Sequence, residues 1–253
     1  MCAIQLGLGL LSIGRQWGVK SVTPPSKQSA VKLIYKAYDL GIRFFDTAPA
    51  YGSSEKLLGQ ALAERPEISQ NSLIASKVGE FWDMETNRST IDHSLDGMCR
   101  SLANSLRTIG TVDILQLHKA DTKSIRAETT FRFFEFAKSC GIRHFGASVS
   151  SLDAGEVACH VNFLSYLQFP FNKSYTLFSS LFPSLYGAQI TPIINRPFAM
   201  GNALQGNSST DVVAHDSFEF IKRHLDHGGV ILTGTSKASH LMRNFKSFKE
   251  TQP

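Results

Sequence analysis

The sequence lacks the features that mark disulfide-rich, metal-binding and membrane proteins. Its four cysteines, Cys2, Cys99, Cys140 and Cys159, form no Cys-x-x-Cys pair, so neither a metal-ligand spacing nor a disulfide framework is indicated. No apolar run approaches the roughly 18 residues that a membrane span requires. The first residues contain no cationic segment followed by a long apolar one, so no signal peptide is expected. These absences predict reduced thiols and a cytoplasmic protein.

Runs of like charge are also absent. The chain carries 26 Lys and Arg against 21 Asp and Glu, a net charge of +5, but the basic residues are scattered along it. Scattered charge without basic and aromatic motifs argues against nucleic-acid binding. A mildly basic mouth that attracts a phosphate-bearing cofactor accounts for the charge equally well. Hydrophobic residues make up 42% of the chain, which is enough for a sizeable core.

Short apolar runs alternate with amphipathic stretches along the 253 residues. The runs predicted as strands are Leu6–Leu11, Phe44–Asp46, Leu73–Lys77, Ile114–His118, His144–Ser148, Leu164–Phe169, Ile190–Asn195 and Val230–Thr233. The stretches predicted as helices are Gln28–Leu40, Ser54–Ala63, Thr90–Ile109, Thr129–Cys140, Leu152–His160, Ser179–Gly187, Val212–Leu225 and Ala238–Phe245. The length fits two ordinary domains or one barrel of about 250 residues. About eight β–α units without a break in composition favour a TIM-type (β/α)8 barrel, a single domain over residues 1–253, rather than an open doubly wound sheet.

Polar residues close four successive predicted strands. They are Asp46, Lys77, His118 and Ser148. The C-terminal ends of the strands form the active-site mouth of such a barrel. Each residue alone has an ordinary alternative, such as a helix-capping aspartate or a lysine on the solvated rim. Together they predict a site at the mouth, beneath a loop rich in Gly, Asn and Ser at Gly201–Asp211.

The segment Asp46-Thr-Ala-Pro-Ala-Tyr-Gly-Ser-Ser-Glu55 resembles the signature that follows the second strand of aldo-keto reductases. The similarity continues in register at Ile74–Lys77, Asp113–His118, Gly141–Ser148, Gln168 and Gly234–Asn244. The resemblance implies reduction of an aldehyde or ketone to an alcohol, or the reverse reaction. It implies NADP(H) as the hydride carrier, with NAD(H) as the alternative, and a small carbonyl or alcohol substrate. It implies no nucleic-acid or membrane partner and leaves the oligomeric state open.

Carbonyl reduction requires a proton at oxygen as well as a hydride at carbon. A tyrosine hydroxyl can donate that proton, but the ordinary phenol pKa near ~10 is poorly matched to neutral pH. A neighbouring ammonium stabilises the phenolate and lowers this pKa. We therefore expect Tyr51 to donate the proton beside Lys77, with Asp46 holding Lys77 and His118 bonding the carbonyl oxygen. The resemblance assigns the same roles to these four residues.

The cofactor is expected across the barrel mouth, because barrel phosphate sites commonly form from the loops after strands seven and eight. The residues predicted to contact it are Ser148, Gln168, Asn195, Arg196, Gly234, Thr235, Ser236, Lys237, His240 and Asn244. Among these, the resemblance assigns Ser148 and Gln168 to the nicotinamide carboxamide. A Gly-x-Gly-x-x-Gly fingerprint is not formed after Gly7, since Ser12 stands at its last position.

Several positions depart from the family pattern. Val149 stands where many members carry an asparagine beside the carboxamide, and Asn195 where an aromatic often stacks on the nicotinamide ring. His240 replaces an arginine that frequently binds the 2′-phosphate, although Lys237 lies nearby to compensate. The long C-terminal substrate loop of many relatives has no counterpart. We therefore expect an open pocket, for which the predicted walls are Trp17, Phe81 and Trp82.

Two other functions are possible for a barrel with this sequence. A non-catalytic barrel that binds a nicotinamide nucleotide as a sensor or partner subunit needs no proton donor, so the set of Tyr51, Lys77, His118 and Asp46 argues against it. A phosphate-binding isomerase or aldolase would use Lys77 in a Schiff base. It would leave Tyr51 and Gln168 without a purpose.

Overall fold

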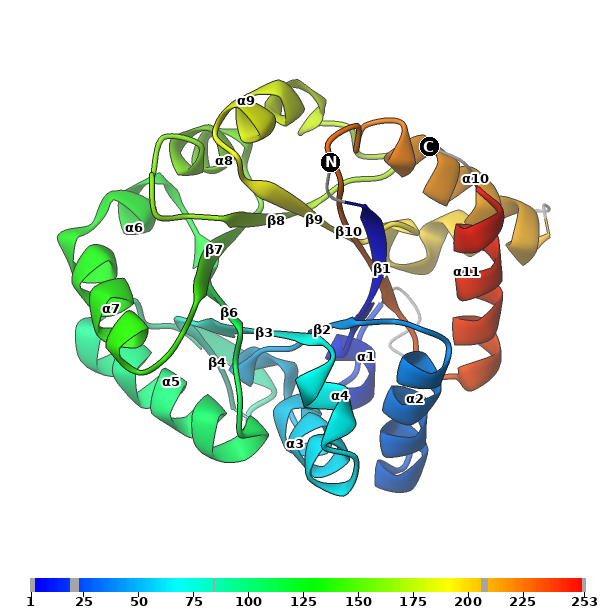
Figure 1. Ribbon diagram of the computed structural model, residues 1–253, viewed down its shortest axis with the longest axis horizontal. Coiled ribbons are helices and arrows are strands. Elements are labelled where there is room, and N and C mark those ends of the chain that lie inside the picture. The colour runs from blue at the N-terminus through cyan, green and yellow to red at the C-terminus, as the bar shows by residue number, and fades with distance from the viewer. Residues whose placement is uncertain (1–2, 19–22, 84, 206–208, 252–253) are drawn as a thin grey trace.

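The protein is a closed barrel of eight parallel strands with helices around it (Figure 1). The computed structural model describes residues 3–18, 23–83, 85–205 and 209–251. The strand order around the barrel is β1-β10-β9-β8-β7-β6-β3-β2. The barrel strands are β1 (Ile4–Gly9), β2 (Phe44–Asp46), β3 (Leu73–Val78), β6 (Ile114–Ala120), β7 (His144–Val149), β8 (Tyr166–Pro170), β9 (Thr191–Asn195) and β10 (Gly229–Gly234). The predicted (β/α)8 fold is confirmed.

Helices form the outer layer. They are α1 (Leu11–Gly14), α2 (Lys27–Asp39), α3 (Ser54–Glu64), α4 (Glu67–Gln70), α5 (Leu95–Ile109), α6 (Thr122–Arg126), α7 (Glu128–Ser139), α8 (Leu152–Ala158), α9 (Phe182–Gly187), α10 (Thr210–Lys222) and α11 (Ala238–Glu250), with 3-10 turns η1 (Pro49–Tyr51), η2 (Ser179–Leu181) and η3 (Ala199–Gln205). Serine side chains cap four of the helices by accepting a backbone N–H three residues on, and these serines are Ser26, Ser94, Ser151 and Ser209. Among the described residues, no helix is both long and apolar enough to cross a membrane.

Two apolar layers hold the barrel together. The larger lies between the strands and the helices, and it includes outward-facing strand residues such as Leu8 and Phe45. A smaller cluster fills the barrel itself, and its members are Phe44, Ala75, Ile114, Ile193, Val230 and Leu232. Because strand residues two apart face the same side, this filling decides which later residues of each strand also point inward.

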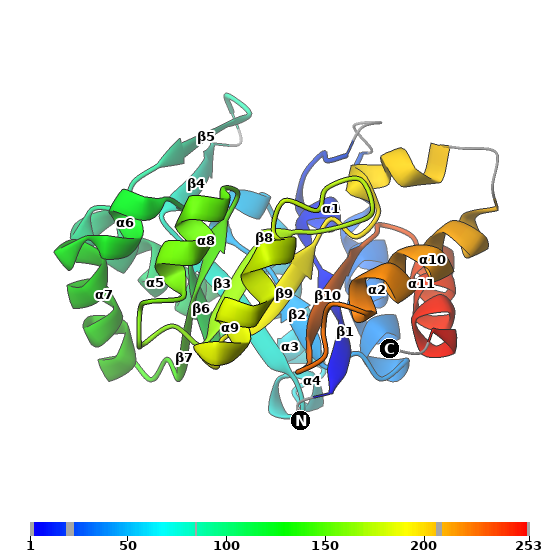
Figure 2. The same cartoon turned by 90° about the horizontal axis from the view of Figure 1, so that it is seen from above.

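An antiparallel hairpin follows β3 where the sequence predicted part of a helix. Strands β4 (Glu80–Asp83) and β5 (Arg88–Ile91) pair from Glu80 with Ile91 to Asp83 with Arg88. The predicted helix Thr90–Ile109 is therefore wrong at its start, because α5 begins at Leu95 behind the capping Ser94. Figure 2 shows the hairpin rising at the end of the barrel that also carries α1.

Smaller differences concern the ends of elements. The first strand stops at Gly9, since Leu11 already begins α1, so the predicted end at Leu11 is wrong. The predicted helix Ser179–Gly187 divides into η2 and α9. Cys2 and part of the predicted Gly201–Asp211 loop lie outside the described residues. The three cysteines within them are free, and they are Cys99, Cys140 and Cys159.

Helices α3 and α5 pack closely at Gly59, where a Cβ atom would overlap the backbone oxygen of Thr108. Gly59→Ala should therefore lower the free energy of unfolding by about 1–3 kcal/mol through overpacking, although alanine favours a helix by about 1 kcal/mol. Gly187→Ala is the matched control, since a Cβ there meets nothing within 4 Å. Urea unfolding measures both variants. Equal stability of the two would contradict the close packing.

Candidate active site

The polar residues of the site lie on strand faces that point into the barrel. Phe44 and Ala75 belong to the apolar filling of the barrel, and Asp46 and Lys77 follow each of them by two positions. The alternation of a strand therefore turns both polar side chains to the same interior. They form a layer above the apolar filling, at the C-terminal ends of β2 and β3.

Lys77 and Asp46 form a buried ion pair. Lys77 Nζ lies 2.7 Å from Asp46 Oδ1 and donates a second hydrogen bond to the backbone oxygen of Thr47 at 2.9 Å. Lys77 is 0% exposed and Asp46 is 2% exposed. Two amides also donate to the Asp46 carboxylate, Gln116 at 3.2 Å and Gln168 at 3.4 Å. Burial works to lower the pKa of Lys77, but Asp46 and Tyr51 together outweigh it and the net pKa is raised, so the ammonium stays charged.

Tyr51 lies on η1, directly after β2. Its ring centroid is 4.8 Å from Lys77 Nζ and 5.7 Å from the ring of His118, which it meets edge-on. Burial raises the pKa of the Tyr51 phenol, while Lys77 lowers it and Asp46 raises it further. The effect of Lys77 has the predicted direction, but the predicted net fall in pKa is wrong because burial dominates. The phenol therefore holds its proton at neutral pH.

His118 is in contact with a carboxylate that the sequence analysis did not identify. Its Nδ1 lies 2.9 Å from Glu80 Oε2, with side chains 8% and 4% exposed. The angle departs from that of a good hydrogen bond, since Nδ1 has no partner by hydrogen-bond geometry. Burial lowers the pKa of His118 and Glu80 opposes that fall. Burial would raise the pKa of Glu80, but His118, Lys119 and Ser89 together bring it to about 2. At neutral pH we therefore assign a neutral ring beside an ionised carboxylate.

A glycine turn brings Glu80 to this position. Gly79 has φ +94°, a left-handed conformation that L side chains rarely adopt, and a Cβ there would overlap the His93 ring. His93 in turn lies 2.8 Å from the backbone oxygen of His118. Lys119, the next residue, also has a positive φ of 52°. A glycine followed by an acid just after Lys77 was the visible signal for Glu80, but its pairing with His118 depends on turn geometry.

Buried amide oxygens mark the side of the mouth where the cofactor is expected. Gln116 Oε1, Gln168 Oε1 and Asn195 Oδ1 are buried and have no hydrogen-bond partner among the described residues. Gln168 lies in β8 and Asn195 ends β9, while Ser148 is half-buried in the neighbouring β7. An amide N–H group on a ligand is the donor that such acceptors need. The residues present therefore fit a nicotinamide carboxamide.

The segment after β10 has the features of an anion site. Gly234 ends β10, and Lys237 is the N-cap residue of α11, with its N–H bonded to Thr235 Oγ1 at 3.1 Å. A helix N-terminus attracts phosphate. The adjoining predicted residues are the half-buried Ser236, the exposed Arg196 and Asn244, which donates to Thr233 Oγ1 at 2.7 Å.

His240 does not add a fixed charge to this segment. Burial and the charges of Arg243 and Lys237 lower the pKa of His240. Because the side chain is exposed, we give more weight to the two charges than to burial. The ring is therefore neutral at neutral pH, unlike the arginine that it replaces in many relatives.

Two of the three predicted wall residues meet through an arginine. Arg15 Cζ lies 3.9 Å from the ring centroid of Trp82 and 5.8 Å from that of Trp17. Phe81, between Glu80 and Trp82, instead lines a separate pocket of about 390 Å³ with Pro49 and residues of α5. The structure therefore does not bring Phe81 together with the two tryptophans.

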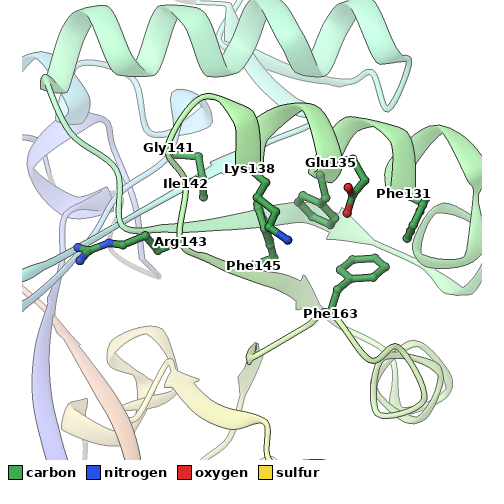
Figure 3. Close-up of a pocket in the computed structure, with 9 residues that line it drawn as sticks. Phe131, Glu135, Lys138, Gly141, Ile142, Arg143, Phe145 and Phe163 are labelled. Carbon is green, nitrogen blue, oxygen red and sulfur yellow. The ribbon is translucent and has the colours of Figure 1, made fainter.

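Another pocket, of about 530 Å³, lies away from these residues, between α7 and the start of β7 (Figure 3). Phe131 and Phe163 meet edge-on at one side of it, with ring centroids 5.7 Å apart, and Glu135 and Lys138 also line it. It contains none of the predicted site residues, and the N-terminal end of a barrel strand is not where chemistry takes place. We do not assign it to the site.

Comparisons with known proteins identify the family of the chain. The model of the "Aldo/keto reductase family" matches residues 5–168. The chain is 32% identical to pyridoxal 4-dehydrogenase of Microbacterium luteolum over 140 residues, which is 45% of this chain and 39% of that protein. It is 29% identical to L-galactose dehydrogenase of Arabidopsis thaliana over 216 residues, 78% of this chain and 62% of that protein. The matches thus span less than two thirds of these relatives.

Solved structures extend the similarity over nearly the whole chain. A protein from Pseudomonas aeruginosa assigned to the aldo-keto reductases superposes with a TM-score of 0.79 at 25% identity, covering 96% of this chain and 88% of that one. The holo form of an aldo-keto reductase from Bacillus halodurans superposes with a TM-score of 0.82 at 19% identity, covering 98% and 87%. The second likeness speaks for the fold alone. On the family match over more than half of its length, the chain belongs to the aldo/keto reductase family.

Proposed function

We propose that the protein is an oxidoreductase that reduces an aldehyde or ketone to an alcohol with NADPH, or catalyses the reverse reaction. The observation that carries the proposal is the buried Lys77–Asp46 pair beside Tyr51 and His118 at the barrel mouth. A nucleotide-binding sensor gains nothing from a proton donor next to a buried ammonium. The family match and the unpaired amide oxygens at the mouth support the nicotinamide cofactor.

In this proposal the bound cofactor supplies a hydride to the carbonyl carbon. Tyr51 holds a proton at its hydroxyl and releases it to the carbonyl oxygen, and Lys77 then stabilises the phenolate. Asp46 keeps Lys77 charged and oriented. His118 bonds the same oxygen through Nε2. Because Glu80 lies against Nδ1, the ring carries its first proton there and becomes a donor at Nε2 on taking up a second.

A direct assay tests the activity. The protein is mixed with NADPH and 4-nitrobenzaldehyde, and the absorbance of the reduced nicotinamide is followed. Consumption of NADPH that requires the aldehyde is the expected result. If neither NADPH nor NADH is consumed with aldehydes or ketones, nor NADP or NAD reduced with alcohols, the proposed function is wrong.

Tyr51→Phe should reduce turnover at least ~10²-fold because the proton donor is lost. The affinity for NADPH should stay within about twofold, since the predicted cofactor contacts lie on other loops. Tyr35→Phe is the control, because Tyr35 bonds Glu64 on the outer helices. Steady-state kinetics and nucleotide titration measure the two effects. Near-normal turnover of the Tyr51→Phe variant would remove Tyr51 from its role.

Glu80→Gln should lower the pKa of His118, since the Glu80 charge opposes the fall that burial causes. Reduction needs the protonated ring in this scheme, so the decline in rate should begin at lower pH. A fall of about one unit in the pKa of His118 would lower the protonated fraction, and so the rate at pH 7, about tenfold. Asp83→Asn removes a charge from the same strand without contacting His118 and is the control. A pH–rate profile unchanged from the wild type would contradict this role of Glu80.

Lys237→Ala should weaken NADPH binding about 10- to 100-fold, the worth of one charge-assisted contact to the 2′-phosphate. NADH binding should change little. Because the pKa of His240 is lowered, any gain in preference for NADPH from its charge should appear only in acid. Lys246→Ala, an exposed lysine on the same helix, is the control. Titrations of NADPH and NADH measure both affinities. Equal affinities in the wild type would show that the site does not recognise the 2′-phosphate.

A further inference from the structure

Arg15 lies beside the turn that carries Tyr51. The backbone oxygen of Gly14 accepts the N–H of Ser53 at 3.1 Å and its hydroxyl at 3.3 Å. A Cβ atom on Gly52 would lie 3.2 Å from Cβ of Arg15. The end of α1 is therefore packed directly on the residues that follow Tyr51. Arg15 is held next to the predicted proton donor at the mouth.

The guanidinium of Arg15 is fixed by aromatic rings. It stacks on Trp82 of the β4–β5 hairpin at 3.9 Å, and the Trp17 ring, which Arg196 also approaches at 5.7 Å, lies 5.8 Å away. Stacking occupies a face of the guanidinium, whose N–H groups lie in its plane and remain free to bond an acceptor there. One of these groups, Nε, is buried and has no hydrogen-bond partner among the described residues. Such an unpaired buried group destabilises the protein unless a ligand supplies an acceptor.

Two other stacked arginines of the chain differ in this respect. Arg43 stacks on Tyr38 at 3.9 Å and donates to the backbone oxygens of Tyr38 and Ile42. Arg65 stacks on Tyr35 at 5.2 Å and forms ion pairs with acidic side chains, which are Asp39 and Glu67. In both cases the protein supplies the acceptors that the fork of N–H groups requires. At Arg15 it leaves Nε without one.

The nearby acid does not fill this role. Glu80 acts on the charge of Arg15 from a distance, but its carboxylate lies against His118 at 2.9 Å. Burial lowers the pKa of Arg15, and Glu80 and Tyr51 oppose that fall. A guanidinium remains charged at any physiological pH. The mouth therefore presents an oriented positive charge beside the group that is to protonate the carbonyl.

We propose that Arg15 binds an anionic group of the substrate, so that the preferred substrates are acidic carbonyl compounds. The planar fork matches the oxygens of a carboxylate or a phosphate and binds either in a bidentate manner. The anion then lies at Trp82 while the carbonyl oxygen lies at Tyr51 and His118. This inference rests on the proposed function, because it names the substrate class of the same site.

The test compares matched aldehydes on the wild type and on Arg15→Met, which keeps most of the apolar stem. The substrates are 4-carboxybenzaldehyde, its neutral methyl ester and 4-formylphenyl phosphate. For the preferred anion, kcat/KM should exceed that of the ester in the wild type and fall about 10- to 100-fold in Arg15→Met. The ester should change less than about twofold. Arg15→Lys should recover only part of the loss, since it restores the charge without the fork. Arg88→Met, on the exposed β5 strand, is the control.

Comparing the carboxylate with the phosphate shows which anionic group Arg15 binds, because the substrate whose kcat/KM falls more in Arg15→Met carries that group. An equal loss for acid and ester would overturn the inference, since it would show that Arg15 only supports the turn of Tyr51. A wild type that prefers the ester over both anions would overturn it as well.

A binding measurement separates this inference from the proposed function. Benzoate and phenyl phosphate are titrated into the protein while the fluorescence of Trp17 and Trp82 is followed. A saturable change that Arg15→Met abolishes supports an anion site even if no aldehyde is reduced. Binding that Arg15→Met leaves unchanged, or no binding of either anion, contradicts the inference even if neutral aldehydes are reduced.

Discussion

The buried charge of Lys77 is the constraint on which the rest of the site depends. Removing one partner from a buried ion pair costs about 3–5 kcal/mol, because the other charge is left uncompensated. The fold therefore surrounds Lys77 with acceptors, namely the carboxylate of Asp46 and the backbone oxygen of Thr47. A second acid in this region, Glu55, accepts hydrogen bonds from the hydroxyl groups of Ser76 and Ser105. Burial raises the pKa of Glu55 and thus favours its uncharged form, so Asp46 is the main counter-charge of Lys77.

The barrel meets this constraint through the register of its strands. Asp46 is paired with Ala75 across β2 and β3, and Lys77 is paired with Gln116 across β3 and β6. The inward face of each strand is set by the apolar filling below, so a shift by one residue would turn the polar layer out of the barrel. The same alternation therefore directs the apolar side chains of the lower barrel and the polar side chains of the mouth toward the barrel interior.

Features that depend on local sequence patterns could be predicted from the sequence, while those that depend on the assembled fold could not. The closed barrel and the places of Asp46, Lys77 and His118 near the C-terminal ends of its strands follow from strand patterns and a family signature, both of which are local in sequence. The contact of Glu80 with His118 joins residues far apart in the chain through a left-handed turn at Gly79, and the same hairpin brings Trp82 to Arg15. The helical pattern predicted from Thr90 concealed that hairpin. The net pKa of Tyr51 also escaped prediction, because burial is a property of the assembled mouth.

The two faces of the β4–β5 hairpin make different contacts. Glu80 and Trp82 are two residues apart and share one face, toward His118 and Arg15, while Phe81 between them lies against α5. Insertion or deletion of a single residue before Glu80 would exchange the faces, removing both contacts at once and presenting a phenyl ring to the mouth.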